Sequence, residues 1–386
     1  MAIWTEAEAM ALLVMACPAY GVRRKALGAA GSALAVVSEP QRWAGQLTES
    51  GVKRLRQTLQ RGEARLDALR GAGIALLIQG APGYPSLLSR IAKPPHLLFV
   101  RGEPSLEDRL PIAMVGTRTA TEYGLRHSRR IAQELAQAGA CIVSGIALGV
   151  DAAAHRGALD GGGRTVAVLG SALDCFYPEE NAPLMQEILE SGGSVVTEYA
   201  PGIMPGRFTF LDRNRIIAGM SLGVIVTEGL ARSGALRTAH DALEAEREVF
   251  ALPGSVDNPM TALPHKLIAE GAHLASCAED VLDVLREQHG VIAERIPSVM
   301  PKERKRQPAG ADAQRGQQAK PAAPGIPEGL GDEERAVYAA LMCGEADFDA
   351  LCAATGVEPD ALGAVLTMME MDGMIEALPG LSYRLV

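Results

Sequence analysis

The chain has 386 residues, of which 48% are hydrophobic and only 4% are aromatic. This length predicts two or three domains, and this composition predicts cores filled mainly by Ala, Val, Leu and Ile, as in layered α/β proteins. The shortage of aromatic residues excludes long aromatic stacking surfaces. No apolar stretch approaches the ~18 residues needed to span a bilayer, and no basic leader precedes one, so we expect a cytoplasmic protein without membrane contacts.

The net charge of −9 is unevenly distributed along the chain. Residues 327–386 carry twelve acidic and two basic residues, a net charge of −10, which leaves +1 for residues 1–326. The first 326 residues are therefore nearly neutral, and their composition is compatible with a local basic groove for a polyanion.

Four parts follow one another along the chain. Residues 1–72 predict short helices and a small all-helical domain. Residues 73–288 alternate short β-branched runs with helical stretches, which predicts a parallel sheet covered by helices on both faces, an extended Rossmann-like α/β core. Residues 289–326 are rich in Pro, Gly, Ala, Gln and charge and predict a flexible linker. Residues 327–386 predict three helices and a strand pair, the order of a winged-helix domain.

Four strand-to-helix turns of the core have a composition suited to an anion. Ligands of parallel α/β sheets gather at the carboxyl ends of the strands, where helix N-termini offer free N–H groups. The turns lie at residues 116–122, 144–151, 210–217 and 228–236. In the first turn, Thr119 and Glu122 match a capping box. Together the four turns predict an extended phosphate-binding groove at one edge of the sheet.

The candidate contacts within these turns are arginines, an asparagine and small residues that let a ligand approach the backbone. They are Arg118, Ser144, Gly145, Arg213, Asn214, Arg215, Arg232, Ser233 and Gly234. Ordinary capped turns remain the alternative for each turn alone, and a buried ion pair with Glu198 or Glu228 is the alternative for Arg213 or Arg215. His155 and Asp151 share one helix face, an arrangement that suits an acid–base pair. The alternative is a histidine that stabilises the helix or lies in the core.

The sequence predicts neither a metal nor a cofactor. The six cysteines form no CxxC pair, which favours buried reduced thiols over disulfides or a zinc site. The turn at residues 144–151 is neither GxGxxG nor GxxxxGK[ST], which excludes the usual dinucleotide and P-loop sites there.

An ordered series of motifs between residues 83 and 272 resembles the DprA/Smf family, the DNA-processing proteins of natural transformation. The motifs are GYP (83–85), KPPHLL (93–98), VGTR (115–118), SGIALGVDAAAHRGAL (144–159), TVAVLG (165–170), YPEEN (177–181), FLDRNRIIAGMS (210–221), SGALRTA (233–239), FALPGS (250–255) and LIAEGA (267–272). The helical start and the winged-helix end also resemble that family's architecture.

The resemblance implies a Rossmann-like core, an N-terminal helical domain of the SAM or helix-hairpin-helix type, and a C-terminal winged helix. It implies a non-catalytic protein, often a homodimer, that binds and protects single-stranded DNA and loads a RecA-type recombinase on it during natural transformation. DNA contacts are implied at the matching candidate residues, with the arginines foremost.

Two other functions compete with this interpretation. A nucleotide-processing N-glycosidase on a related fold would use the sheet edge near Glu228 and Ser233-Gly234, but its PGGxGTxxE signature is absent. A transcription factor would use the winged helix, but the expected recognition helix, residues 358–373, has four acids and no Lys or Arg.

Overall fold

The computed structural model describes most of the chain. The described residues are 4–289, 331–342, 346–357, 362, 365, 366, 369, 375–378 and 382–385. The chain divides into two compact units, Met1–Glu303 and Arg304–Val386. The linker expected over residues 289–326 lies, apart from His289, outside the described residues. Across these described ranges, no helix combines the length and the apolar character needed to cross a membrane.

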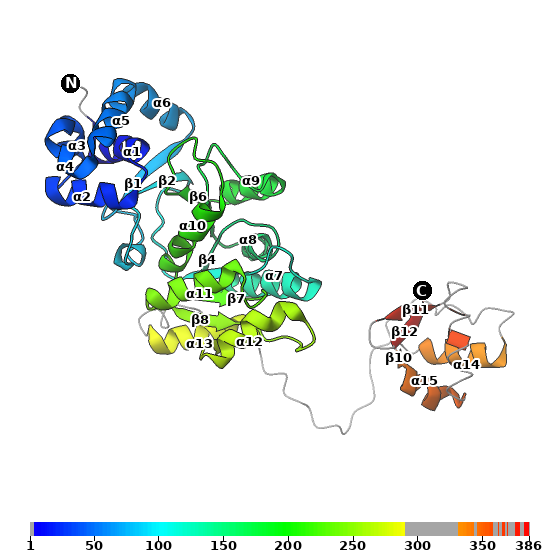
Figure 1. Cartoon of the computed structure of the whole chain (residues 1–386). Coiled ribbons are helices and arrows are strands. Elements are labelled where there is room, and N and C mark those ends of the chain that lie inside the picture. Colours follow the sequence, from blue (N-terminus) through cyan, green and yellow to red (C-terminus); the bar gives the residue numbers. More distant parts are fainter. Residues whose placement is uncertain are drawn as a thin grey trace, which may run out of the picture. The chain divides into compact units, whose positions relative to one another are not determined.

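The first unit begins with six short helices that pack on one end of a sheet (Figure 1). They are α1 (Glu6–Ala16), α2 (Tyr20–Ala30), α3 (Ala33–Ser38), α4 (Ala44–Leu47), α5 (Glu49–Gln60) and α6 (Gly62–Gly71). A capping box starts α1, because Thr5 Oγ1 accepts from Glu8 N at 3.2 Å and Glu8 Oε2 accepts from Thr5 N at 2.8 Å. Buried residues of α1 share one apolar cluster with Leu97 and Phe99, so the helices and the sheet have a continuous core.

A nine-stranded sheet forms the centre of this unit, in the order β1-β2-β6-β5-β4-β3-β7-β8-β9. Its strands are β1 (Ile74–Ile78), β2 (Leu97–Gly102), β3 (Pro111–Val115), β4 (Cys141–Ser144), β5 (Thr165–Val168), β6 (Ser194–Thr197), β7 (Gly223–Val226), β8 (Glu248–Ala251) and β9 (His273–Leu274). The seven strands that are neighbours in the order β6-β5-β4-β3-β7-β8-β9 are all parallel to one another, as expected.

One strand departs from the expected parallel arrangement. β2 pairs antiparallel with both β1 and β6. A parallel pair needs a crossover, usually a helix, to carry the chain back along the sheet. Between β1 and β2 the chain forms only the 3₁₀ turn Leu88–Arg90, so the two strands run in opposite directions.

Helices cover both faces of the sheet because successive side chains of a buried strand point to opposite sides. Ile112 and Met114 pack with α7 (Glu122–Gln137), α8 (Val150–Asp160) and α13 (Ala278–Gln288). Ala113 and Val115 pack on the other face with the next group of helices. These are α10 (Arg207–Gly219), α11 (Gly234–Glu244) and α12 (Ala262–Ala269). A further helix, α9 (Ala182–Glu190), packs on β5 and β6.

The sheet has its topological switch point between β3 and β7. From β3 the chain continues through α7 to β4, whereas from β7 it continues through α11, on the opposite face, to β8. The two connections separate at this point and leave a crevice at the carboxyl ends of β3 and β7. The fold thus places the first and fourth predicted turns beside each other.

The second unit has the arrangement expected of a winged helix. Its described elements are α14 (Asp332–Leu341), β10 (Ala346–Asp347), α15 (Phe348–Thr355), β11 (Ile375–Leu378) and β12 (Ser382–Leu385). The three strands form an antiparallel sheet in the order β10-β12-β11. Most of the expected third helix, residues 358–373, lies outside the described residues.

Phe250 gives a direct test of the sheet packing. Its side chain is fully buried on β8, so Phe250→Ala should lower the free energy of unfolding by about 3–5 kcal/mol. Leu243, on α11, is 59% exposed, and Leu243→Ala should change that free energy by less than about 0.5 kcal/mol. Urea denaturation measures both, and equal losses would contradict this placement of β8.

Candidate functional site

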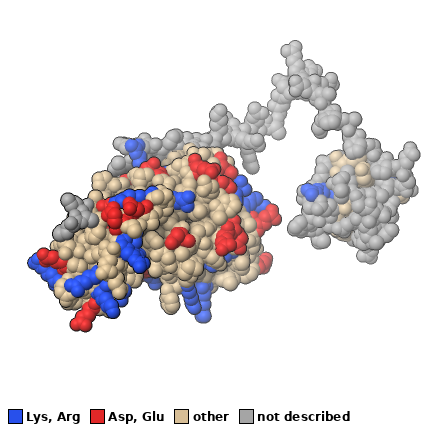
Figure 2. Space-filling model, turned by 90° about the horizontal axis from the view of Figure 1, so that it is seen from above, with Lys and Arg blue, Asp and Glu red and all other residues tan. Residues whose placement is uncertain are grey.

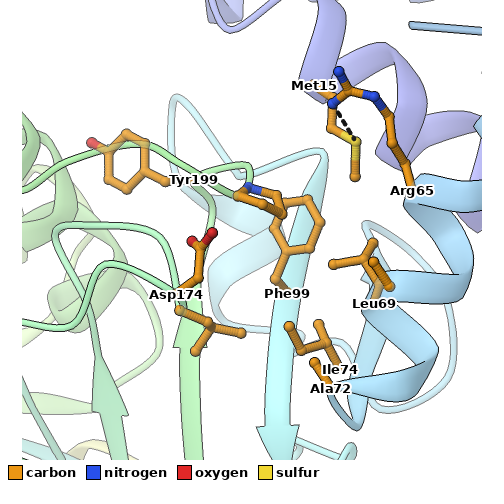
Figure 3. A pocket seen from close by; sticks show the side chains of 11 residues that line it. Met15, Arg65, Leu69, Ala72, Ile74, Phe99, Asp174 and Tyr199 are labelled. Atoms are coloured by element: carbon orange, nitrogen blue, oxygen red, sulfur yellow. Dashed lines mark hydrogen bonds between the residues drawn. The ribbon is translucent and has the colours of Figure 1, made fainter. Parts of the chain in front are cut away.

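Two cavities of different character lie in the first unit. One, of about 200 Å³, lies where α1 and α6 meet β2, and Figure 3 shows its apolar walls. The polar groups at its margin already have partners: the Tyr199 hydroxyl donates to Thr209 O at 3.2 Å, and Asp174 accepts from Gly202 N at 3.0 Å. Arg65 lies along Met15 (Figure 3). This cavity gathers apolar side chains rather than converging polar ones.

The other cavity is a groove of about 720 Å³ at the carboxyl edge of the sheet, and the four predicted turns meet there. Its lining residues are Val115, Gly116, Thr117, Arg118, Ala147, Asp151, Arg207, Phe210, Leu211, Arg213, Asn214, Ile217, Arg232, Ser233, Gly234, Ala235, Arg237 and Thr238. Five of them are arginines and one is an aspartate, so the lining is strongly positive. On the face shown in Figure 2, basic and acidic side chains are interspersed.

Arg118 extends into the groove from a fixed backbone. The preceding Gly116 must be a glycine, because an added Cβ would lie 2.5 Å from Val150 Cγ2. Thr117 N donates to Glu228 O at 2.8 Å, which joins the turns after β3 and β7. The Arg118 side chain is exposed, and its Cζ lies 5.0 Å from the centroid of the Phe210 ring. A cation–π contact thus holds this guanidinium over the groove.

Glu228 is a buried carboxylate that fixes the start of α7. It accepts from Thr121 N at 2.8 Å, from Thr121 Oγ1 at 2.6 Å and from Asn258 Nδ2 at 3.2 Å. Thr121 is the N-cap of α7 and its Oγ1 accepts from Gly124 N at 3.3 Å, so the capping box predicted for Thr119 and Glu122 is wrong. Glu228, near which the N-glycosidase alternative places its active site, therefore holds the surrounding turns in place through these hydrogen bonds.

Arg213 lies inside the protein at the base of the groove and is 5% exposed. Its Nη1 donates to Gly145 O at 2.9 Å and also to Val168 O, so it ties α10 to the ends of β4 and β5. Gly145 leaves room for this guanidinium, since an added Cβ would lie 2.4 Å from its nitrogens. Asn214 Nδ2 donates to Gly234 O at 3.5 Å, linking α10 to the start of α11.

Three candidate residues, Arg215, Ser144 and Gly145, lie outside the groove lining. Arg215 donates through Nη2 to Glu198 Oε1 at 2.5 Å and Oε2 at 2.6 Å, the buried ion pair considered from the sequence. Ser144 is buried, and its Oγ donates to Met114 O at 2.6 Å. Gly145 lines a small adjoining pocket. That pocket is lined by Arg118, Gly145, Ala147, Leu148, Tyr177, Pro178 and Phe210.

The sequence analysis missed two groove residues. Arg207 and Phe210 line the groove from α10. A signal was present, since FTF (208–210) places two phenylalanines directly after Arg207 in a chain poor in aromatic residues. Among the described residues, Arg118, Arg207 and Arg232 form no ion pair, whereas Arg237 pairs with Asp241 at 2.9 Å.

His155 is a core residue rather than the acid–base partner of Asp151. It is fully buried, and its Nδ1 lies 2.7 Å from Thr165 Oγ1, which itself donates to Ile142 O. Burial, reinforced by Arg213, lowers the pKa of His155 to about 3. Burial raises the pKa of Asp151, and Arg213 opposes that shift.

Comparisons with known proteins show which family this chain matches. Residues 75–286 match the family model described as DNA recombination-mediator protein A, and residues 320–380 match the DprA winged helix domain. Protein Smf of Escherichia coli (strain K12) is 43% identical over 203 residues, which is 53% of this chain and 54% of that protein. The match therefore spans about half the length of this relative. Protein Smf of Synechocystis is 36% identical over 318 residues, 78% of each chain.

Solved structures give the same correspondence. The X-ray structure of DNA processing protein A from Streptococcus pneumoniae has a TM-score of 0.59 and 34% identity, covering 72% of this chain and 98% of that chain. A structure of DNA processing protein A from Helicobacter pylori, described for its single-stranded DNA binding mode, has a TM-score of 0.50 and 30% identity, covering 56% and 96%.

The buried neutral His155 makes stability depend on pH. Its pKa lies below the ordinary 6.5, so between pH 6.5 and about 3 the unfolded state binds a proton that the folded state does not. The free energy of unfolding should therefore decrease as the pH is lowered through this window. This residue contributes up to about 1.4 kcal/mol of that decrease per pH unit. His155→Gln should reduce the slope measured by urea denaturation from pH 6.5 to 4.5. His240→Gln, at an exposed position, is the control; unchanged slopes in both variants would refute the assignment.

Proposed function

The chain belongs to the DNA recombination-mediator protein A family, and we propose that it binds single-stranded DNA in the groove between the turns after β3 and β7. The observation that carries the proposal is the convergence of four turns on one groove lined by five arginines and one aspartate. Such a lining suits the repeated negative charge of a nucleic-acid backbone.

Phosphates would be held by exposed guanidinium groups and by a helix start. Arg118, Arg207 and Arg232 are exposed in the groove and lack ion-pair partners among the described residues. Ser233 is the N-cap of α11, and its buried Oγ has no hydrogen-bond partner within the described structure. A buried hydroxyl without a partner beside free N–H groups at a helix start favours an anion as the missing partner.

Aromatic side chains beside the arginines favour a single strand over a duplex. Tyr177 is 44% exposed, its ring centroid lies 6.0 Å from that of Phe210, and Phe208 is 85% exposed. Bases of a single strand can stack on such rings, whereas the bases of a duplex are already stacked and shielded.

The candidate residues then divide into two roles. Arg118, Arg232, Ser233 and Gly234 would contact the strand directly, because they line the groove and their groups are accessible or unpartnered. The remaining five would act mainly by shaping the groove, because their polar groups are buried or engaged with this chain's own atoms. They are Ser144, Gly145, Arg213, Asn214 and Arg215.

We further propose that the protein protects single-stranded DNA and loads a RecA-type recombinase on it during natural transformation, as a cytoplasmic homodimer without catalytic activity. The family description as a recombination mediator supports this role. The groove geometry supports the absence of catalysis, because Asp151, the one carboxylate among its lining residues, is buried. The nearby carboxylate of Glu228 accepts from three donors of this chain. Light scattering of the purified protein tests the dimer, and a nucleotide-hydrolysis assay tests the absence of catalysis.

Binding to labelled oligonucleotides tests the proposed function directly. The full-length protein should bind a single strand more tightly than a duplex of the same length, and its affinity should fall steeply with salt because phosphates are neutralised. Fluorescence anisotropy between about 50 and 200 mM salt measures both effects. Equal binding to the duplex would refute the proposal.

Arg118→Ala should weaken single-strand binding by about 1–3 kcal/mol and reduce the salt slope by about one, similarly for all sequences, as expected of a backbone contact. The fixed backbone and the Phe210 contact limit the entropy lost on binding. Arg56→Ala, on the exposed face of α5, is the matched control and should change affinity little. If the control weakened binding more than Arg118→Ala, the groove would lie elsewhere.

A further inference from the structure

Three consecutive residues of the turn after β4 are each held by a buried side chain from a different element. Gly145 O accepts from Arg213 Nη1 at 2.9 Å, and Ala147 N donates to Asp151 Oδ2 at 3.3 Å. Between them, Ile146 O accepts from Asn181 Nδ2 at 2.8 Å. The first two side chains belong to α10 and α8. Asn181 ends the 3₁₀ turn Glu179–Asn181, within the YPEEN motif, of which the proposed function uses only Tyr177.

The middle residue of this turn has an unfavourable backbone conformation. Ile146 has φ +56°, in the left-handed region, where a β-branched residue is a genuine outlier. Its side chain is fully buried and packs with Leu184 and Ile188. Such a conformation persists only where the surroundings over-determine it. Here the apolar core holds the side chain and Asn181 holds the carbonyl group.

The position of this turn matters to the groove. Ala147 lines both the groove and the small adjoining pocket, which Gly145, Leu148 and Phe210 also line. Gly149, the N-cap of α8, follows directly. A change at Ile146 would therefore displace one wall of the groove and the start of α8.

We propose that Asn181 is a positioning residue, which holds Ile146 in its left-handed conformation and so keeps the turn at residues 145–148, through which Ala147 lines the groove, ready for a DNA strand. This inference rests on the proposed function of the groove. Asn181 is 6% exposed and lines neither the groove nor the small adjoining pocket, so it acts on the strand only through the turn. Without its amide donor the buried Ile146 carbonyl loses its partner, and the backbone relaxes toward negative φ. A strand that binds must then restore the turn, and affinity falls.

The test compares Asn181→Ala with Glu180→Ala in the full-length chain. Glu180 is the exposed neighbour in the same turn, which makes it a matched control. Asn181→Ala should weaken binding to a fluorescein-labelled oligothymidine by about fivefold or more, and Glu180→Ala by less than about twofold. Hydrogen–deuterium exchange without DNA should accelerate in peptides that cover residues 144–150 and stay unchanged in those that cover α13.

Asn181→Leu provides a second variant, because it keeps the branched shape of the side chain and removes the amide group. Asn181→Leu should also weaken binding and accelerate exchange in residues 144–150. It takes the place of Asn181→Ala if that variant fails to fold. Normal affinity with normal exchange in either folded variant would overturn the inference, as would faster exchange throughout the first unit, which indicates a general structural role. If the wild-type protein fails to bind single strands, the proposed function fails, while the exchange measurement still decides whether Asn181 holds the turn.

Discussion

A buried guanidinium, that of Arg213, joins three parts of the sheet edge and determines the shape of the groove. A charged group inside a protein is costly unless its donors find partners, and here two strand-end carbonyl groups accept from Nη1 and Asn214 Oδ1 accepts from Nε. The partners impose a further constraint, since a Cβ at position 145 would lie 2.4 Å from the Arg213 guanidinium nitrogens and would displace them. Once α10 is fixed in this way, Arg207 and Phe210 on its first turns lie in the groove wall.

Much of the fold follows from the sequence, because continuous apolar runs bounded by Gly and polar residues mark buried strands. Eight such runs correspond to β1–β8. The direction of β2 was not predictable in this way, since composition and period are the same in both directions and only the connection decides. The short strand β9 was missed because His273 and Leu274 give no apolar run at all.

The site was predictable at the level of turns but less so at the level of side chains. The carboxyl ends of parallel strands lie at one edge of the sheet, so the turns that follow them had to meet there. Whether an arginine lies on the inner or the outer face of its helix depends instead on helical register. Arg213 stands three and four residues before the buried Ile216 and Ile217, and that spacing places it on the inner face of α10. The same spacing stands in FLDRNRII (210–217), where two apolar residues follow the arginine at the helical period.

The continuous core between the N-terminal helices and the sheet has a consequence for how the chain unfolds. Alternate residues of β1 (Ile74, Leu76 and Ile78), together with Leu97 and Phe99 of β2, are covered by these helices. The helices and the α/β core therefore melt as one cooperative body, and a fragment that starts at β1 would expose this apolar strip at a sheet edge and self-associate. The second unit has its own small core and undergoes a separate transition.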